Sequence, residues 1–229
     1  WYANAWNNPF VMDAVKNSLI TAGSTAVLST LIGTAATLGM ERVSGVVRQI
    51  FDALIYVAII VPGIVIGIST LIAFVTMFDL INPVLASLFG SGAFRFSMGL
   101  WTVILAHVLF NMAVVVLVVR ARLAGMDRTL IEAAQDLYAT PFAVFWQVLL
   151  PLLLPSIIAA GLLAFTFSLE DYIITSFVAG PYSTLPIYVF ASIRRGITPE
   201  INAIGTVILA ASFSLLMLAQ FLLRRKERS

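Results

Sequence analysis

The chain has 229 residues, of which 61% are hydrophobic and only 10% are charged, with a net charge of +2. Soluble domains are about 45–50% apolar and about 25% charged, so this composition excludes an ordinary water-soluble enzyme. A membrane-spanning helix needs about 20 apolar residues, which allows roughly five or six spans and little else. We therefore expect an all-α transmembrane protein, with residues 1–229 forming a single transmembrane domain.

Missing residue types exclude several kinds of chemistry. The chain has no cysteine, and therefore no disulfide and no thiolate metal site. Its two lysines, Lys16 and Lys226, lie outside any G-x-x-x-x-G-K-[ST] loop, so ATP binding of that kind is not expected on this chain. A single histidine, His107, excludes an H-E-x-x-H zinc site. We expect no metal or cofactor on this chain, and its small net charge gives no reason to expect nucleic acid.

Five apolar stretches are long enough to cross a bilayer as helices. They cover residues 17–40, 51–77, 98–119, 155–178 and 202–223. In the first stretch, small residues recur at every fourth position, a spacing that lets helices pack closely in lipid. These residues are Thr25, Ser29, Gly33 and Thr37. In the second stretch, Val61-Pro62-Gly63 predicts a kink or local unwinding, because proline removes a hydrogen bond and clashes with the preceding turn.

Basic residues in the loops predict the orientation of the chain. Nine of the 13 lysines and arginines lie in loop 41–49, in segment 120–152 and in the C-terminal tail. The positive-inside rule therefore places these three segments in the cytoplasm. Residues 1–16 then lie outside, and a cytoplasmic N-terminus would require a sixth span upstream of Trp1.

Segment 120–152, between the third and fourth stretches, begins with a short predicted helix. Thr129 and Glu132 fit a capping box, in which their side chains satisfy the first backbone N–H groups of a helix. Ala133 and Ala134 keep one side of this helix small, so that a partner surface can approach closely. The pattern predicts a helix exposed for contact with another protein.

A second predicted helix follows in the same segment. Thr140-Pro141 is typical of a helix start, with the threonine as the N-cap and proline at the first helical position. Its apolar stripe should lie along the membrane interface and consists of Phe142, Phe145, Trp146 and Leu149. Leu150-Pro151 and Pro155 are expected to end this helix and turn the chain into the fourth span.

Glu132-Ala133-Ala134, followed by Leu150-Pro151, resembles the EAA loop of permease subunits in binding-protein-dependent ABC importers. The resemblance implies a type I ABC importer permease bundle whose short helix is the coupling helix, seated in a groove of a cytoplasmic ATPase. The residues that the resemblance assigns to coupling are Thr129, Glu132, Ala133, Ala134, Asp136 and Pro151. The family pattern has glycine where this chain has Tyr138. A tyrosine in a left-handed turn should cost about 1 kcal/mol or force another turn geometry.

The segment from Phe165 to Ala203 indicates which group of ABC importer permeases the chain resembles. In order and spacing it is similar to the second permease subunit of spermidine/putrescine importers, as are Trp1-Tyr2, Asn17-Ser18-Leu19 and Ala106-His107. The resemblance implies that the chain helps to move polyamines into the cytoplasm. Relatives that carry ferric iron, thiamine or aminoethylphosphonate have similar loops, so these solutes are alternatives.

The resemblance also implies partners and a location. The partners are a homologous second permease subunit, two cytoplasmic ATPase subunits that hold ATP and Mg, and an extracytoplasmic substrate-binding protein. The chain itself is then a transport subunit and not an enzyme. Its location is the lipid of the bacterial inner membrane, crossed several times, with the C-terminus in the cytoplasm.

Two adjacent acids, Glu170 and Asp171, stand inside the fourth predicted span. An intramembrane acid costs at least about 2.5 kcal/mol to insert, so it should face protein or a water-filled path. Adjacent helical positions point about 100° apart, so one acid can line a pathway while the other meets a neighbouring helix. Two carboxylates suit a cationic cargo, and the alternatives are an ion pair with a partner arginine or a protonated structural acid. Ser168, Tyr172 and Tyr56 are predicted to add hydroxyl or cation–π contacts to the pathway.

His107 and Asn111 share one face of the third span and predict a hydrogen bond between helices. A protein of another class, a self-contained secondary transporter or channel, would use Glu170 and Asp171 for ion coupling. Such a protein would need no EAA loop, and the inverted repeats expected of it are not visible in the sequence. The ABC permease is therefore the favoured interpretation.

Overall fold

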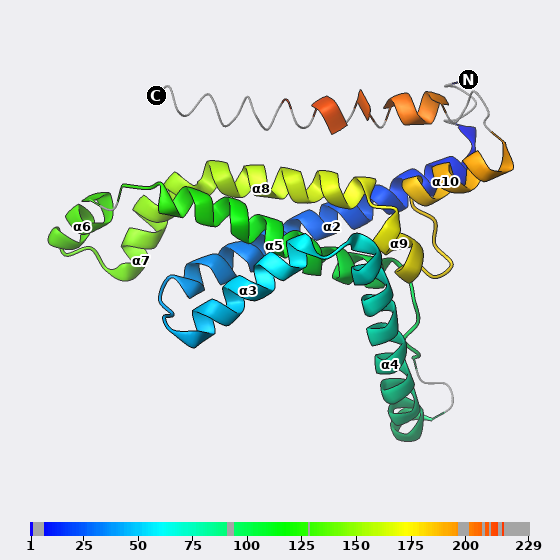
Figure 1. Cartoon of the computed structure of the whole chain (residues 1–229), viewed down its shortest axis with the longest axis horizontal. Helices are drawn as coiled ribbons and strands as arrows, with labels where there is room; N and C mark the ends of the chain where they lie inside the picture. Colours follow the sequence, from blue (N-terminus) through cyan, green and yellow to red (C-terminus); the bar gives the residue numbers. More distant parts are fainter. Residues whose placement is uncertain are drawn as a thin grey trace.

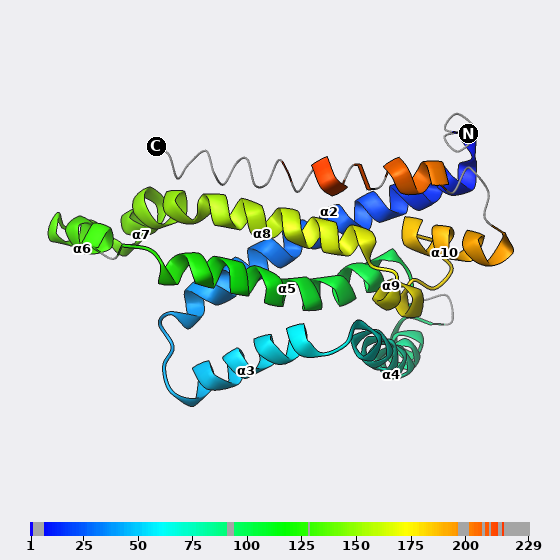
Figure 2. The same cartoon turned by 45° about the horizontal axis from the view of Figure 1, so that its top comes forward.

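The computed structural model of the protein describes residues 7–90, 94–127, 129–196 and 202–207, together with 1, 209, 210, 212–214 and 217. Every regular element within these residues is helical. Three long helices lie side by side and form the centre of the molecule (Figures 1 and 2). They are α2 (Pro9–Met40), α5 (Leu100–Ala124) and α8 (Leu150–Glu170), and α2 packs against both of the others.

The contact between α2 and its neighbours uses the small residues of α2. Its buried side includes the four residues that the spacing singled out, namely Thr25, Ser29, Gly33 and Thr37. A Cβ atom added at Gly33 would lie 2.8 Å from Cγ1 of Val115 in α5, so only glycine permits this approach of the two helices. The hydroxyl groups of Ser29 and Thr37 donate to carbonyl oxygens one turn earlier, at 2.6 and 2.8 Å, and therefore need no external partner. The predicted packing face is confirmed.

The second predicted span, 51–77, is not a single helix. It is divided into α3 (Val46–Ile60) and α4 (Gly63–Phe89), and the two residues between them, Val61 and Pro62, have extended backbone. The local unwinding expected at Val61-Pro62-Gly63 is therefore confirmed, whereas the bounds 51–77 are wrong. The break changes the direction of the chain: α4 leaves the other helices and points away from them in Figure 1.

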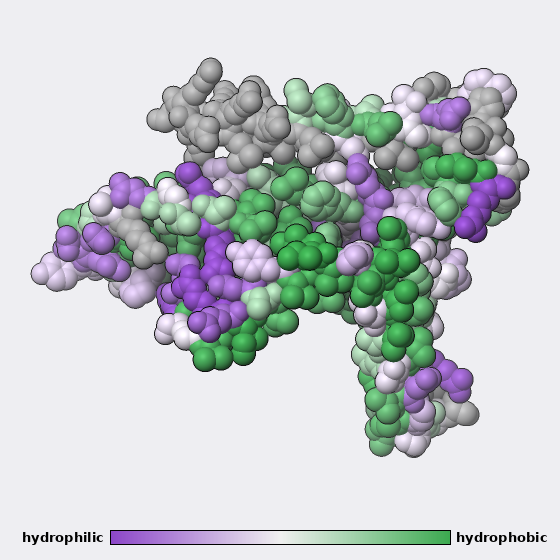
Figure 3. All heavy atoms as spheres, viewed as in Figure 1, coloured by the Kyte–Doolittle hydropathy of each residue, from purple (hydrophilic) through white to green (hydrophobic). Residues whose placement is uncertain are grey.

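α3 and α4 are attached to the bundle at different places. α3 is held on α5 by a two-pronged ion pair, in which the Arg120 guanidinium donates to both carboxylate oxygens of Asp52, with Nη2 and Oδ2 3.1 Å apart. The first turns of α4 pack on α9 (Ile173–Val178), where Gly67 meets the ring of Phe177. Figure 3 shows apolar atoms along most of α4. This helix is exposed within the single chain, so lipid or another protein must cover it.

The fourth predicted span, 155–178, is wrong at both ends. The helix begins at Pro141 as α7 (Pro141–Val144), passes through the π-helical turn η1 (Phe145–Leu149) and continues as α8 to Glu170. The prolines at 151 and 155 therefore do not turn the chain. In the π turn the Leu150 N–H bonds to the Phe145 carbonyl, five residues back, and Pro151 falls in the first turn of α8. Proline is well tolerated at that position.

Beyond Glu170 the chain breaks and folds back as two short helices, α9 and α10 (Leu185–Arg195). Two hydrogen bonds tie the loop before α10 and its first residue to α2: Asn17 Nδ2 donates to the Ser183 carbonyl at 2.9 Å, and the Leu185 N–H donates to Ser18 Oγ at 2.8 Å. The end of the bundle with α9 and α10 lies opposite the end with α6 (Thr129–Asp136) (Figure 1).

Four helices in the described part of the chain are long and apolar enough to cross a membrane. They are Pro9–Met40, Gly63–Phe89, Leu100–Ala124 and Pro141–Glu170. The fifth predicted span, 202–223, is described only in part, and the residues of it that are described, 202–207, 209, 210, 212–214 and 217, are helical. The helix expected upstream of Trp1 lies outside this sequence and stays a prediction.

Candidate functional site

The predicted two-helix segment is present: α6 and α7 project together from the far end of the bundle (Figures 1 and 2). The capping of α6 differs from the prediction. The Asp127 carboxylate accepts the backbone N–H of Thr129 at 3.0 Å, and Thr129 is the first helical residue, so the predicted capping box of Thr129 and Glu132 is wrong. The backbone N–H and hydroxyl of Thr129 hold the pKa of the Asp127 carboxyl below its usual range. An aspartate two residues before the helix competes well for this N–H because its short carboxylate reaches it directly.

The end of α6 shows how the chain accommodates Tyr138. The Tyr138 N–H donates to the Gln135 carbonyl at 2.9 Å and the Ala139 N–H to the Ala134 carbonyl at 3.1 Å. This pair of bonds is the Schellman motif, which requires a left-handed residue at the position of Tyr138. Its φ is +58°, so the tyrosine adopts the left-handed turn that favours glycine. No other turn geometry is forced, and the strain of about 1 kcal/mol is expected to stay in the turn.

The two faces of α6 have different surroundings. Glu132 and Gln135 line a cavity of about 610 Å³ between α6 and the ends of α2 and α5. Ala133 and Asp136 are exposed and, with Thr129, lie on a neighbouring face, about 100° around the helix axis. None of the eight residues of α6 is buried. The chain therefore presents a face with a small residue at its centre, as contact with another protein would require.

The predicted apolar stripe of the second helix is divided between two environments. Phe145 and Leu149 line the same cavity as Glu132, whereas the rings of Phe142 and Trp146 are mostly exposed. Pro151, the remaining residue assigned to coupling, is exposed on α8 and does not belong to α6. α6 packs on η1 and α7 and is thereby joined to the start of the long α7–α8 helix.

At the opposite end of the bundle, the two adjacent acids have different environments. Glu170 is the last residue of α8 and its side chain is exposed. Asp171 has extended backbone and turns inward, where its Oδ1 lies 3.3 Å from Nε2 of His107. The same oxygen accepts the backbone N–H of Thr175 at 2.9 Å, which satisfies a free donor at the start of α9.

His107 is the centre of this polar cluster and is buried in α5. Its Nδ1 lies 2.7 Å from the hydroxyl of Ser168, and its Nε2 lies 3.0 Å from the hydroxyl of Thr175. The predicted hydrogen bond between helices is confirmed for His107. Asn111 does not share in it: its amide donates to the His107 carbonyl, within α5, at 2.9 Å.

The remaining pathway candidates are not brought together. The ring of Tyr172 lies against that of Phe190 of α10, tilted by 34° with 4.3 Å between ring centroids, and the Arg194 guanidinium lies 5.0 Å from the centroid of Phe190. Tyr56 is exposed on α3, one turn after Asp52, which pairs with Arg120. Arg120 and His107 lie about 20 Å apart along α5. Tyr56 lies at the Arg120 end and the two acids at the His107 end, so they do not form one site. The pathway roles of Glu170, Asp171, Tyr172, Ser168 and Tyr56 stay predictions.

Sequence reasoning missed Thr175 and Thr102. The Thr102 hydroxyl lies 2.6 Å from the carbonyl oxygen of Val178, the last residue of α9. A signal for Thr175 was present, because it follows Asp171 by four residues and an acid before a helix often caps it. No pattern in the sequence indicates that Thr102 meets Val178, since the two residues belong to distant segments.

The sequence of the chain matches a known protein family and two characterised groups of permeases. Residues 20–229 match the family described as the binding-protein-dependent transport system inner membrane component. The chain is 40% identical over 231 residues to the putrescine transport system permease protein PotI of Escherichia coli, which covers 100% of this chain and 78% of that protein. It is 31% identical over 228 residues to the spermidine/putrescine transport system permease protein PotC of Haemophilus influenzae, covering 99% and 82%.

Solved structures of ABC transporters share the fold. A chain of a bacterial ABC transporter involved in the import of the acidic polysaccharide alginate has a TM-score of 0.77 at 15% identity, over 98% of this chain and 82% of that chain. A chain of the inward-facing MetNI methionine ABC transporter has a TM-score of 0.66 at 15% identity, over 95% and 98%. The chain therefore belongs to the family of binding-protein-dependent transport system inner membrane components and is a permease subunit of an ABC importer, a transport component rather than an enzyme.

Proposed function

We propose that this permease subunit imports polyamines, putrescine and spermidine, across a bacterial inner membrane. The observation that carries the proposal is the similarity, over the entire chain, to permeases of putrescine and spermidine/putrescine transport. The exposed carboxylate of Glu170 at the end of α8 supports it, because a negative group suits the ammonium groups of a polyamine.

The proposed assembly contains a second, homologous permease subunit, two ATPase subunits that bind ATP and Mg, and a substrate-binding protein. The ATPase subunits contact α6, whose outward face is exposed and carries Ala133 at its centre. The second permease covers part of α4, whose apolar side chains are exposed in the single chain. The binding protein docks at the end with α9 and α10. We assign the α6 end to the cytoplasm because basic residues concentrate there and in the C-terminal tail.

The proposed mechanism uses the continuous helix from Pro141 to Glu170. Its 30 residues extend about 45 Å and connect the α6 end of the bundle to the acids at the other end. When ATP closes the ATPase dimer, α6 moves with it and carries the start of this helix, because α6 packs on η1 and α7. The far end of the helix then shifts, and the complex changes between outward-facing and inward-facing states.

Transport by the reconstituted complex tests the cargo. Liposomes with both permeases, the ATPase and the binding protein should take up labelled putrescine and spermidine in an ATP-dependent manner, in preference to thiamine, ferric iron or aminoethylphosphonate. ATP-dependent uptake of one of these three solutes without uptake of either polyamine would refute the proposed cargo and leave the permease assignment intact.

Labelling with a membrane-impermeant thiol reagent tests the orientation, because the chain has no cysteine of its own. Tyr182→Cys, between α9 and α10, should react in intact cells, whereas Leu137→Cys, just after α6, should react only in inside-out vesicles stripped of the ATPase. Both side chains are exposed in the single chain. Labelling of position 137 in intact cells would reverse the orientation and remove α6 from the ATPase.

A further inference from the structure

The break between α8 and α9 is bridged by one side chain from a third helix. Ser168 precedes the break, Asp171 lies within it and Thr175 follows it, and all three contact the imidazole of His107 in α5. Nδ1 faces the side before the break and Nε2 faces the side after it. His107 therefore joins two segments that share no continuous backbone hydrogen bonding at this point.

The partners of the two ring nitrogens indicate which of them carries a hydrogen toward Asp171. The Ser168 hydroxyl donates to Nδ1, and the Nε2–H group points at Oδ1 of Asp171 and Oγ1 of Thr175, at 3.3 and 3.0 Å. The Thr175 hydroxyl in turn donates to the Asp171 carbonyl at 3.0 Å. The tautomer is assigned from these partners. Both ring nitrogens of His107 and Oδ1 of Asp171 have partners in this arrangement, so the cluster fixes the backbone of the break.

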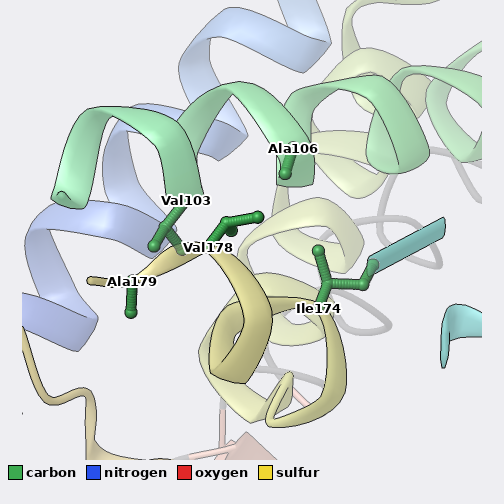
Figure 4. Close-up of a cluster of buried hydrophobic side chains, with 5 residues drawn as sticks. All are labelled: Val103, Ala106, Ile174, Val178 and Ala179. Carbon is green, nitrogen blue, oxygen red and sulfur yellow. The ribbon is translucent and has the colours of Figure 1, made fainter. Parts of the chain in front are cut away.

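A second hydrogen bond between α5 and α9 fixes the position of α9 along α5. Thr102 lies about one and a half turns before His107 on α5 and binds the carbonyl at the end of α9, whereas His107 binds near its start. Between these contacts, Val103 and Ala106 of α5 point toward Ile174 and Val178 of α9 (Figure 4). Both ends of α9 are therefore attached to α5, and the bridged break is the direct connection between α8 and α9.

We propose that His107 is a positioning residue for transport, which holds Asp171 inside the protein and thereby leaves Glu170 as the carboxylate that meets the cargo. Oδ1 of Asp171 is already used by His107 and by the Thr175 N–H, so an ammonium group would be left with only the other oxygen of this partly buried carboxylate. Glu170 is exposed and has no such partner among the described residues. The position of Glu170 at the end of α8 depends on His107, because His107 holds the next residue, Asp171. The cargo part of this inference rests on the proposed function.

Four variants in the reconstituted complex test the inference: Glu170→Gln, Asp171→Asn, His107→Leu and His107→Gln. For each we would measure the temperature at which the solubilised complex denatures, and the ratio of polyamine transported to ATP hydrolysed. Glu170→Gln should denature at the wild-type temperature, with the ratio reduced about tenfold or more. His107→Leu and Asp171→Asn should both lower the denaturation temperature and reduce the ratio about threefold. His107→Gln should restore part of the ratio, because its amide can still donate toward Asp171.

Double variants separate a positioning role from a direct one. If His107 acts through Glu170, the pair His107→Leu/Glu170→Gln should transport no less per ATP than Glu170→Gln alone, since residues of one network are not additive. Thr166→Val is the matched control: it removes a buried hydroxyl of α8 that bonds within its own helix, to the Leu162 carbonyl, and it should leave the ratio unchanged.

Three results would overturn the inference. One is a normal ratio in His107→Leu, which would make the bridge purely structural. Another is a tenfold loss in Asp171→Asn at the wild-type denaturation temperature, with normal transport in Glu170→Gln, which would exchange the roles of the acids. A third is normal transport in both acid variants. If the wild-type complex moves another solute and no polyamine, the proposed function fails, and the same ratios measured with that solute still decide the role of His107.

Discussion

The contact of α2 with α5 at Gly33 can be tested by adding a single methyl group. In Gly33→Ala, the new Cβ would lie 2.8 Å from Cγ1 and 2.9 Å from Cβ of Val115, and 3.1 Å from the Met112 carbonyl oxygen. Favourable carbon contacts need about 3.5–4.0 Å, so one of the two helices must move. Valine has essentially one rotamer in a helix, and the third neighbour is backbone, so a side-chain rotation cannot relieve the contact.

The expected magnitude follows from two opposing effects. Overpacking by a methyl group costs about 1–3 kcal/mol, and replacing a helical glycine by alanine returns up to about 1 kcal/mol. We expect Gly33→Ala to destabilise the protein by about 1–2 kcal/mol, which lowers the denaturation temperature by about 2–8 °C for a chain of this size. Gly23→Ala on the same helix is the control, because no atom lies within 4 Å of its added Cβ. It should be neutral or slightly stabilising.

Thermal denaturation of the detergent-solubilised protein, followed by loss of the monodisperse size-exclusion peak, measures both variants. The double variant Gly33→Ala/Val115→Ala should recover only part of the loss, because alanine lacks the Cγ1 atom of Val115 but keeps the Cβ atom 2.9 Å from the new methyl group. Equal denaturation temperatures for Gly33→Ala and Gly23→Ala would refute the close approach of α2 and α5 at this position.

The other predictions concern the α6 end of the bundle. Tyr138→Gly should relieve the left-handed strain and stabilise the turn by about 1 kcal/mol, seen as slower hydrogen exchange of the last α6 amides, whereas faster exchange would contradict the observed turn. Glu132→Lys or Ala133→Trp should leave the complex assembled but abolish stimulation of the ATPase by loaded binding protein, and persistent stimulation with normal uptake would remove α6 from the coupling route. Because the Asp127 pKa is lower in the folded state, its cap should be fully effective above the usual value of about 3.9 and lost as the pH falls through the lower folded value. Hydrogen exchange of the first α6 amides should show this loss, and Asp127→Asn should remove the pH dependence.

The features that the sequence predicted correctly depend on local chemistry. Composition and span length indicated a membrane protein, because no soluble core could hold so much apolar surface. The break at Pro62 follows from the missing N–H of proline, and the packing face of α2 follows from small residues at every fourth position. The second helix of segment 120–152 follows from Thr140-Pro141, because the threonine side chain accepts the Ala143 N–H and proline fits the first helical position. These signals act within a few residues, so they can be seen without the fold.

The features that only the tertiary structure decided depend on distant partners. Two adjacent acids in the sequence give no indication of which one turns inward; that depends on His107, which lies in another helix and binds on both sides of the break. The end of α8 at Glu170 has the same origin, since an apolar pattern continues beyond it into α9. The long α7–α8 helix also escaped prediction, because one π turn places Pro151 where a proline does not break the helix. A hydrogen bond between side chains tens of residues apart leaves no repeating pattern in the sequence. Only the folded chain brings its two partners together.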